Sequence, residues 1–388
     1  MKVFIPLILF CSVSVWAEPF YQAELMFPLQ GKHVHSSSIV ELPNGDLRSC
    51  WFYGSGERSA NDVVVQGSRL AKGSNEWEKP YVLADTPDLP DCNPVLFIDG
   101  KDRLRLVWIA VIAAGWENSL LRTKFSEDYL NPGPPVWNWQ DVIILKPGEE
   151  FPKIIKKRFD EFDWDRGWAE YAPEYEVMIE EAAKDPRKRQ TGWMPRIQPT
   201  TLPSGRILLP LYSDGFNVSL CAISDDGGDT WRASGPMVGM GPIQPTICRR
   251  KDGTLVAWMR DSGDMPPRVM ESTSSDDGET WTAAVDTDIP NPGSSLTSLV
   301  LDSGEWVLVH NDTEEGRRSL SCKMSDDEGK TWKWERHLEK HPVNTFAYPN
   351  MIQTKDGLIH VSYSYKEEGK GASIKHVAIN KDWVKQGD

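Results

Sequence analysis

The stretch Ser224-Asp225-Asp226-Gly227-Gly228-Asp229-Thr230-Trp231 has two further copies in the chain, SSDDGETW at 274–281 and SDDEGKTW at 325–332. All three follow the pattern Ser-x-Asp-x-Gly-x-Thr-Trp, and their first residues lie 50 and 51 positions apart (274 − 224 and 325 − 274). A fixed period of this length, in a unit rich in strands, indicates one blade of a β-propeller. In such a motif an Asp accepts backbone N–H bonds, a Gly adopts a positive φ and a Trp anchors the hairpin turn.

This pattern is the Asp-box, and through its three copies the chain resembles the sialidase superfamily over nearly all of residues 18–388. The resemblance implies an all-β fold, a six-bladed β-propeller. The segment Phe20–Phe27 is expected to supply the outer strand that closes the ring against blade 6. Runs rich in β-branched and aromatic residues predict the inner strands of the six blades. These strands are expected to open at His35, Asn93, Gln198, Gln244, near Ser294 and at Tyr348.

One segment, residues 148–192, interrupts this pattern. It is charged, with Glu-Glu and Lys-Lys runs, and stretches such as Tyr175–Lys184 favour a helix. We therefore predict a helical insertion between blades 2 and 3. It is either a solvated excursion or a lid over the channel that carries Trp164, Trp168 and Tyr171.

The first 17 residues have the features of a secretory signal. Lys2 precedes an apolar run from Val3 to Val15, and Val15-Trp16-Ala17 is typical of a cleavage site. The run is too short to span a bilayer, and no other stretch approaches about 20 apolar residues. We therefore expect a secreted or periplasmic protein with no membrane span.

The charge and the cysteine content limit the classes of ligand that the protein is expected to bind. A formal net charge of −14 argues against nucleic acid and anionic membranes as partners, but not against an acidic sugar held by a few arginines. Five cysteines follow Cys11, without CxxC spacing, and seven histidines show no clustered spacing. The cysteines are expected to be buried small hydrophobic residues, and the sequence predicts neither a metal nor a cofactor.

In a propeller the first residues of the inner strands converge on one mouth of the channel. Here they are mostly polar, and four of them (Asn93, Gln198, Gln244 and Tyr348) directly precede a proline. Because proline restricts the residue before it, we expect these four to be extended and their side chains to form one ring with His35.

The family resemblance gives some of these residues roles. Tyr348 matches the sialidase nucleophile, a known exception to the rule of two catalytic carboxylates. Arg260 and Arg317 match two of the three arginines that clamp the substrate carboxylate, a task suited to the planar guanidinium.

The chain departs from the family at three positions. His35, Asn93 and Gln244 stand where the family has an Arg, an acid/base Asp and a tyrosine-polarising Glu. Amides do not exchange protons at neutral pH, so ordinary sialidase activity is expected to be weak.

Replacement acids lie nearby in the sequence. Glu57 follows the second strand of blade 1, Asp91 precedes Asn93, and Asp214 ends a strand of blade 3. His35 titrates near neutrality in its ordinary state, so we expect His35 and Glu57 to be the proton-transfer pair beside Tyr348. The remaining candidates are assigned to substrate binding: Arg260, Arg317, Asn93, Gln198, Gln244 and Asp214.

Three functions fit these residues, because a fold does not fix a reaction. The first is an exo-glycosidase that acts on a terminal acidic sugar of a glycan or polysaccharide. The second is a polysaccharide lyase that cleaves next to a uronic acid by β-elimination, for which arginines, amides, His and Tyr suffice. The third is a glycan-binding propeller without catalysis.

Overall fold

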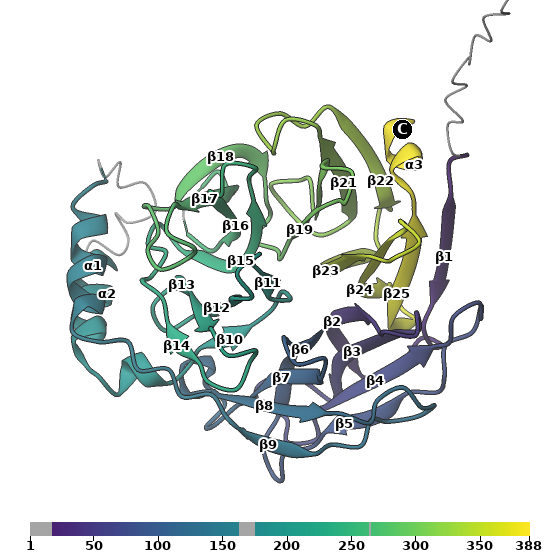
Figure 1. The fold of residues 1–388 in the computed structure, drawn as a ribbon, viewed down its shortest axis with the longest axis horizontal. Coiled ribbons are helices and arrows are strands. Elements are labelled where there is room, and N and C mark those ends of the chain that lie inside the picture. The colour runs from purple at the N-terminus through teal and green to yellow at the C-terminus, as the bar shows by residue number, and fades with distance from the viewer. Residues whose placement is uncertain (1–17, 163–174, 264) are drawn as a thin grey trace, which may run out of the picture.

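Six antiparallel sheets stand in a ring around a central channel in the computed structural model of the chain (Figure 1), which describes residues 18–162, 175–263 and 265–388. The six-bladed β-propeller expected from the Asp-boxes is confirmed. The proposed signal peptide, residues 1–17, lies outside the described residues. No helix among those residues is long and apolar enough to cross a membrane.

Apart from the outermost strand of blade 6, each blade runs outward from the channel in chain order. Blades 1 and 2 consist of β2 (His33–Glu41), β3 (Leu47–Gly54), β4 (Val64–Leu70), β5 (Tyr81–Ala84), β6 (Asp91–Ile98), β7 (Leu104–Ala110), β8 (Leu120–Ser126) and β9 (Trp139–Val142). Blade 3 consists of β10 (Met194–Pro195), β11 (Thr200–Thr201), β12 (Ile207–Ser213), β13 (Val218–Ser224) and β14 (Arg232–Ala233). Blades 4 and 5 consist of β15 (Pro242–Arg249), β16 (Leu255–Asp261), β17 (Arg268–Ser274), β18 (Val285–Pro290), β19 (Thr297–Val300), β20 (Trp306–His310), β21 (Ser319–Ser325) and β22 (Trp334–Lys340).

Blade 6 joins the two ends of the chain. It contains β23 (Thr345–Gln353), β24 (Ile359–Glu367) and β25 (Gly371–Ile379), and its outer strand is the N-terminal β1 (Tyr21–Leu25). The pairing runs antiparallel from Tyr21↔Ile379 to Leu25↔Lys375. The predicted closing strand within Phe20–Phe27 is therefore confirmed, and a short helix, α3 (Lys381–Lys385), follows blade 6.

The three Asp-boxes form the same hydrogen-bonded turn. In the second box the Ser274 hydroxyl donates to Asp276 at 2.8 Å and accepts from the Gly278 N–H at 3.0 Å. Asp276 also accepts from the Thr280 N–H at 2.9 Å and from the Thr280 hydroxyl at 2.6 Å. The boxes at 224–231 and 325–332 repeat these contacts. The motif thus closes the hairpin between the third and fourth strands of its blade.

The glycine of the box also lets neighbouring blades approach. Gly278 and Gly329 have φ angles of +83° and +78°, which residues with a side chain rarely adopt. A Cβ on Gly278 would lie 2.9 Å from Leu208 of blade 3, and one on Gly329 would lie 2.5 Å from Trp258 of blade 4. The Asp-box is therefore a packing element between blades.

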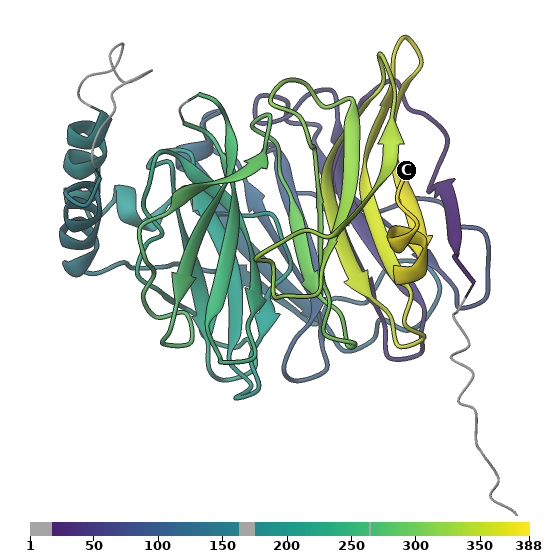
Figure 2. The same ribbon diagram turned by 90° about the horizontal axis from the view of Figure 1, so that it is seen from above.

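The predicted insertion contains two helices, α1 (Glu150–Phe159) and α2 (Tyr175–Lys184), followed by a 3-10 turn, η3 (Lys188–Gln190). Figures 1 and 2 show the helices on the outer side of blade 3, away from the channel. Their buried faces join the core of blades 2 and 3 through Phe151, Ile155, Phe159, Tyr175, Ile179 and Ala183. The helices themselves are not a lid. The aromatic residues proposed for a lid, Trp164, Trp168 and Tyr171, lie outside the described residues.

The cysteines after the proposed signal behave as the sequence predicts. All five are buried and unbonded: Cys50, Cys92, Cys221, Cys248 and Cys322.

Because Trp281 is 2% exposed and packs against blade 3, we predict that Trp281→Ala lowers the free energy of unfolding by about 3–5 kcal/mol. Trp231 is only half-buried, so Trp231→Ala is the matched control and should lower the free energy of unfolding by less. Chemical denaturation measures both. Full stability of Trp281→Ala combined with loss of glycan binding would show that the box is a ligand site instead.

Candidate functional site

Four inner strands each contain a β-bulge near their start, and these bulges set the orientation of the site residues. The strand pairing slips by one residue after His35, Cys92, Ile243 and Ala347. The next residue of each strand has a positive φ: Ser36 (61°), Asn93 (50°), Gln244 (57°) and Tyr348 (57°). The expectation that the residues before proline are extended is therefore wrong at three positions. The bulge, which sets two residues opposite one, imposes the left-handed conformation at a cost of roughly 1–3 kcal/mol each.

Blade 3 departs from this arrangement. Its inner strand is interrupted between Pro195 and Thr200, and Arg196 is the first residue after the paired Pro195. Gln198 does not line the cavity described below; its side chain contacts the Ile39 carbonyl, and it lines a different cavity further along the channel. The prediction that Gln198 belongs to the ring of the mouth is therefore wrong, because the interruption of the strand turns its side chain to the Ile39 carbonyl.

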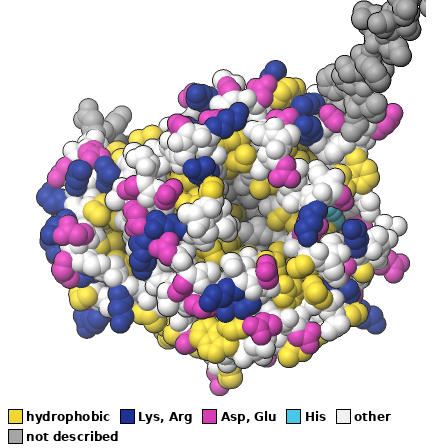
Figure 3. All heavy atoms as spheres, in the orientation of Figure 1, with side chains coloured by type: hydrophobic (Ala, Val, Ile, Leu, Met, Phe, Trp, Pro, Cys, Tyr) yellow, Lys and Arg dark blue, Asp and Glu magenta, His cyan; other side chains and the backbone are white. Residues whose placement is uncertain are grey.

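The other predicted residues of the mouth meet in one cavity of about 200 Å³. The cavity is lined by His35, Phe52, Glu57, Asn93, Trp116, Tyr212, Asp214, Ile243, Gln244, Arg260, Ser262 and Tyr348. No Asp-box residue is among them, as expected for a motif at the opposite ends of the blades. Figure 3 shows the opposite face of the ring, with a hollow at its centre and acidic and basic side chains mixed around it.

Hydrogen bonds from other side chains of this cavity converge on the hydroxyl of Tyr348. It accepts hydrogen bonds from Arg260 Nη1 at 3.1 Å and from Gln244 Nε2 at 3.3 Å. The Gln244 amide also contacts the Tyr212 hydroxyl at 3.2 Å, and Asn93 Nδ2 donates to the same hydroxyl at 3.0 Å. Asn93 and Gln244 thus form a hydrogen-bonded chain that ends at Tyr348.

Positive charge acts on the phenol from several sides. The guanidinium carbons of Arg196 and Arg317 lie 5.0 and 5.4 Å from the centroid of the Tyr348 ring. Burial would raise the pKa of Tyr348, but Arg260, Arg317, Gln244 and Arg196 outweigh it and lower this pKa below its usual value. Tyr348 therefore ionises more readily than an ordinary tyrosine, although Gln244 cannot serve as a carboxylate base.

These arginines form no ion pair with a described carboxylate, although the charge of Arg260 acts on Asp214 and that of Glu57 acts on Arg317. Among the described residues, no carboxylate oxygen lies within 4.0 Å of the guanidinium nitrogens of Arg196, Arg260 or Arg317. Arg196 donates instead to the carbonyls of Ser37 (3.1 Å) and Pro349 (3.0 Å), and burial lowers its pKa to about 10. Arg317 donates to the Gly293 carbonyl at 3.0 Å. Only Arg260 lines the cavity; the other two support Tyr348.

The expected proton-transfer pair of His35 and Glu57 does not form. Glu57 Oε1 lies 3.0 Å from His33 Nε2, so its partner is His33 and not His35. This contact lowers the pKa of Glu57 despite its partial burial. The His35 ring centroid lies 4.1 Å from that of Tyr348. Burial, followed by His33 and the three arginines, holds the pKa of His35 well below its usual value. His35 is thus neutral and Glu57 ionised, and neither is suited to donate a proton.

The two remaining acids differ sharply. Asp91 is fully buried and accepts bonds from Thr86 and from the Trp108 indole at 2.7 Å. It does not line the cavity, so its role is structural. Asp214 does line the cavity, and burial raises its pKa more than the positive charges of Arg260 and Arg58 lower it. Among the acids that line the cavity, Asp214 is the one held toward its protonated form.

Four contributors were not singled out from the sequence: His33, Trp116, Arg196 and Tyr212. His33 alternates with His35 on one strand, and Arg196 lies two residues before Gln198, so both had a local signal. Trp116 belongs to a 3-10 turn, η1 (Trp116–Asn118), and Arg58 stacks 5.6 Å from its ring centroid. Only the folding of separate blades brings Trp116 and Tyr212 to the mouth.

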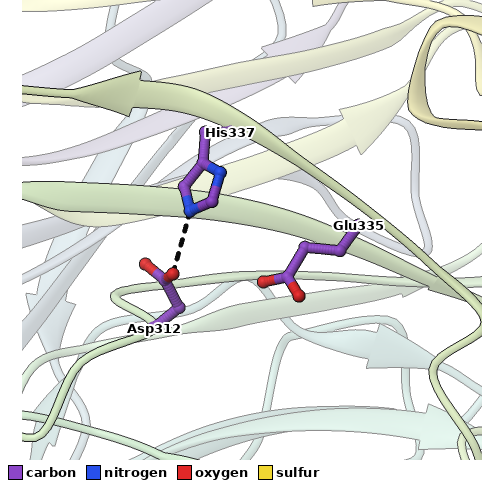
Figure 4. A group of neighbouring side chains, drawn as sticks. All are labelled: Asp312, Glu335 and His337. Carbon is purple, nitrogen blue, oxygen red and sulfur yellow. Dashed lines mark hydrogen bonds and ion pairs between the residues drawn. The ribbon is translucent and has the colours of Figure 1, made fainter. Parts of the chain in front are cut away.

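A second titratable cluster lies in blade 5. Asp312, Glu335 and His337 place potential metal-ligand atoms within 4.8 Å of one another (Figure 4). His337 Nε2 lies 2.9 Å from Asp312, and Nδ1 contacts Asp388. Burial lowers the pKa of His337, but the contacts with Asp388 and Asp312 outweigh it and raise this pKa. The cluster thus ties the loop that also carries Arg317 to the last residue of the chain.

The comparisons with known proteins agree with this fold. Residues 45–158 and 192–361 match the model of the BNR repeat-like domain. An anhydrosialidase of the leech Macrobdella decora is 34% identical over 184 residues, a match that covers 41% of this chain and 23% of that protein.

Solved structures share the fold at low identity. The NanB sialidase of Streptococcus pneumoniae superposes with a TM-score of 0.67 at 12% identity, over 93% of this chain and 71% of that one. A leech intramolecular trans-sialidase in complex with 2,7-anhydro-Neu5Ac gives 0.67 at 13% identity, over 94% of this chain and 71% of that one. Identities this low show a common fold alone. The gap between the two matched ranges of the family model, residues 159–191, falls within the insertion.

The surroundings of Tyr348 lead to a titration experiment. We predict that the ultraviolet difference titration between wild type and Tyr348→Phe shows an ionisation below the usual tyrosine pKa of about 10. Arg260→Met should move it to higher pH. Tyr365→Phe is the control, because burial raises the pKa of Tyr365. Ionisation of Tyr348 only above the usual range would refute the electrostatic activation.

The raised pKa of His337 predicts a pH-dependent stability. A group whose folded pKa is raised stabilises fully below its unfolded pKa, about 6.5 for histidine, and this stabilisation disappears as pH rises through the folded pKa. His337→Gln should therefore be less stable than wild type in mild acid and should approach it in alkali, as measured by urea unfolding. Asp388→Asn should reduce the same dependence, and a difference that grew with pH would contradict the ion pairs.

Proposed function

The chain belongs to the family of BNR repeat-like domains, and from that premise we propose that it is a glycoside hydrolase that removes a terminal acidic sugar from a glycan. The observation that carries this proposal is the group of three guanidinium side chains around Tyr348 without a carboxylate partner among the described residues. Buried cations are costly unless they are compensated, and a substrate carboxylate beside Arg260 would supply the missing charge. Because residues 1–17 resemble a signal, we place this activity outside the cytoplasm, secreted or periplasmic.

Tyr348 is the proposed nucleophile. Its oxygen bonds to the anomeric carbon while the bond from that carbon to the leaving oxygen breaks, which gives a covalent glycosyl–enzyme intermediate. In sialidases a tyrosine takes the place of the second carboxylate. Here Arg260, Arg317 and Arg196 supply the activation that a neighbouring glutamate gives in the sialidase pattern. His35 packs against the phenol ring and holds it in place.

Asp214 is the proposed acid and base. Its raised pKa keeps a fraction of the carboxyl protonated, so that it can give its proton to the leaving oxygen. In the second step the resulting carboxylate takes a proton from the water that attacks the anomeric carbon, and Tyr348 leaves as the phenolate. Glu57, ionised beside His33, is then a substrate-binding group at the rim.

The test is a panel of glycosides of sialic acid and glucuronic acid, measured both by reducing-end release and by ultraviolet absorbance. Hydrolysis releases a reducing end without absorbance, and a lyase would create an absorbing unsaturated uronate. No product from any substrate, together with binding, would identify a lectin. Either of the last two outcomes would overturn the proposal.

The variants separate the roles within the site. Tyr348→Phe should abolish turnover on every substrate. Asp214→Asn should lose about 100- to 10,000-fold on natural leaving groups and much less on nitrophenyl glycosides, whose leaving group needs no acid. Equal losses on both kinds of substrate would exclude Asp214 as the acid.

Arg260→Met tests the substrate's charge. It should weaken binding of the acidic substrate by roughly 2–5 kcal/mol and have little effect on its uncharged methyl ester. An unchanged preference for acid over ester would show that Arg260 does not bind the carboxylate.

A further inference from the structure

The channel contains a second cavity of about 570 Å³ at the end opposite to the candidate site, and we call it the far cavity. The candidate site is formed near the starts of the inner strands, whereas the far cavity is lined by residues near their ends. It belongs to the face whose hollowed centre is visible in Figure 3. Its size falls within the range of about 300–1,000 Å³ that is usual for ligand sites.

Every blade contributes an apolar side chain to the far cavity. In the order of the blades these residues are Val40, Phe97, Ile197, Ile247, Leu299 and Ile352. Five of them lie one or two residues before the end of an inner strand, and Ile197 lies in the interruption of the inner strand of blade 3. Apolar surface gains free energy when it leaves water, so this wall favours an apolar group as its occupant.

The polar side chains of the lining are largely bonded within the protein. Gln353 Oε1 accepts a hydrogen bond from a backbone N–H at 2.8 Å, and the Thr200 hydroxyl donates to the Ile247 carbonyl at 3.0 Å. The hydroxyls of Thr246 and Ser298 lie 3.0 Å from each other. These groups therefore have few hydrogen bonds left to offer to a ligand.

Arg249 is the exception. Among the described residues it is the one charged residue that lines the far cavity, and it ends β15. It is half-buried, no described carboxylate forms an ion pair with it, and its Nε is buried without a hydrogen-bond partner. A Cβ on Gly253, in the turn that follows, would lie 3.2 Å from Arg249 Nη2, so the turn packs against the guanidinium. The far cavity thus combines an apolar wall with one positioned, unpaired cation.

This combination matches an amphipathic anion. A planar guanidinium binds a carboxylate through two parallel N–H bonds, and a cation beside apolar surface is costly unless it is compensated. An inorganic anion would satisfy Arg249 but leave the apolar wall in water. A neutral sugar would satisfy neither.

We propose that the far cavity binds a monocarboxylic acid with an aliphatic tail, with the carboxylate on Arg249 and the tail along the ends of the inner strands. No described residue lines both cavities. Arg196 lies between them, because it donates to the carbonyls of Ser37 on β2 and Pro349 on β23. The ligand is therefore distinct from the sugar proposed to bind at Tyr348, and its binding does not depend on the proposed reaction.

The test is isothermal titration calorimetry of the full chain with octanoate below its micelle concentration. Acetate carries the charge without the tail, and 1-octanol carries the tail without the charge. Arg249→Gln removes the cation, and Leu299→Trp fills the cavity from blade 5. Arg250→Gln is the matched control, because Arg250 is the next residue and equally half-buried but does not line the cavity.

We expect octanoate to bind wild type and Arg250→Gln equally well, and Arg249→Gln about 10- to 100-fold more weakly. Leu299→Trp should lose the binding, and acetate and octanol should each bind wild type at least about 10-fold more weakly than octanoate. No binding of octanoate, equal losses in the two arginine variants, or octanol binding as tightly as octanoate would overturn the proposal.

A last variant separates the far cavity from the candidate site, where another arginine could hold the carboxylate. Arg260→Met should leave the affinity for octanoate unchanged. Loss of octanoate binding in Arg260→Met, or its survival in Leu299→Trp, would place the ligand elsewhere and refute the far cavity as its site. Because calorimetry needs no turnover, these results hold whether or not the chain hydrolyses a glycan.

Discussion

The ring of this propeller depends on the pairing of β1 with β25, which joins residues from opposite ends of the chain. Each blade buries both faces against its neighbours, so the inner strands are held in place only when the ring is complete. Without β1, the outer edge of β25 would present unpaired backbone groups, and blade 6 would have three strands. Tyr348 lies in that blade, on β23, and the position of the proposed nucleophile therefore depends on closure at the far side of the same sheet.

Within the closed ring, a β-bulge that is repeated in four blades helps to form the candidate site. Ser36, Asn93, Gln244 and Tyr348 occupy equivalent positions of four blades, each in a left-handed conformation. Backbone strain of this kind persists only where the surroundings enforce it. In blade 3 the equivalent position belongs to Arg196, whose guanidinium bonds to carbonyls of blades 1 and 6. One blade thus contributes a cation to the ring instead of an amide or a phenol.

The chemistry of the site follows from the residues that surround Tyr348. Gln244 cannot take a proton from Tyr348, but it donates a hydrogen bond to the phenol, and Arg260 does the same. Both contacts favour the phenolate. Asn93 has no acid function, whereas Asp214 lines the same cavity and burial raises its pKa. The insertion also contacts this region from outside the ring, because Gly192 at its end donates a hydrogen bond to the carbonyl of Ser119, the residue after η1.

The sequence by itself determined the number of blades, their inner strands, the closing N-terminal strand and most of the residues at the mouth. These depend on local patterns: the Asp-box needs its own Ser, Asp, Gly and Thr, and a strand needs a run of β-branched and aromatic residues. The tertiary structure alone decided that Glu57 pairs with His33, that Arg196 packs against the Tyr348 ring, and that Asp214 is the cavity-lining acid with a raised pKa. It also placed the two helices of the insertion, α1 and α2, on the outer side of blade 3. The reason is physical: hydrogen-bonded turns form among residues close in the chain, whereas charge balance, desolvation and cavity shape depend on which distant side chains the closed ring brings together.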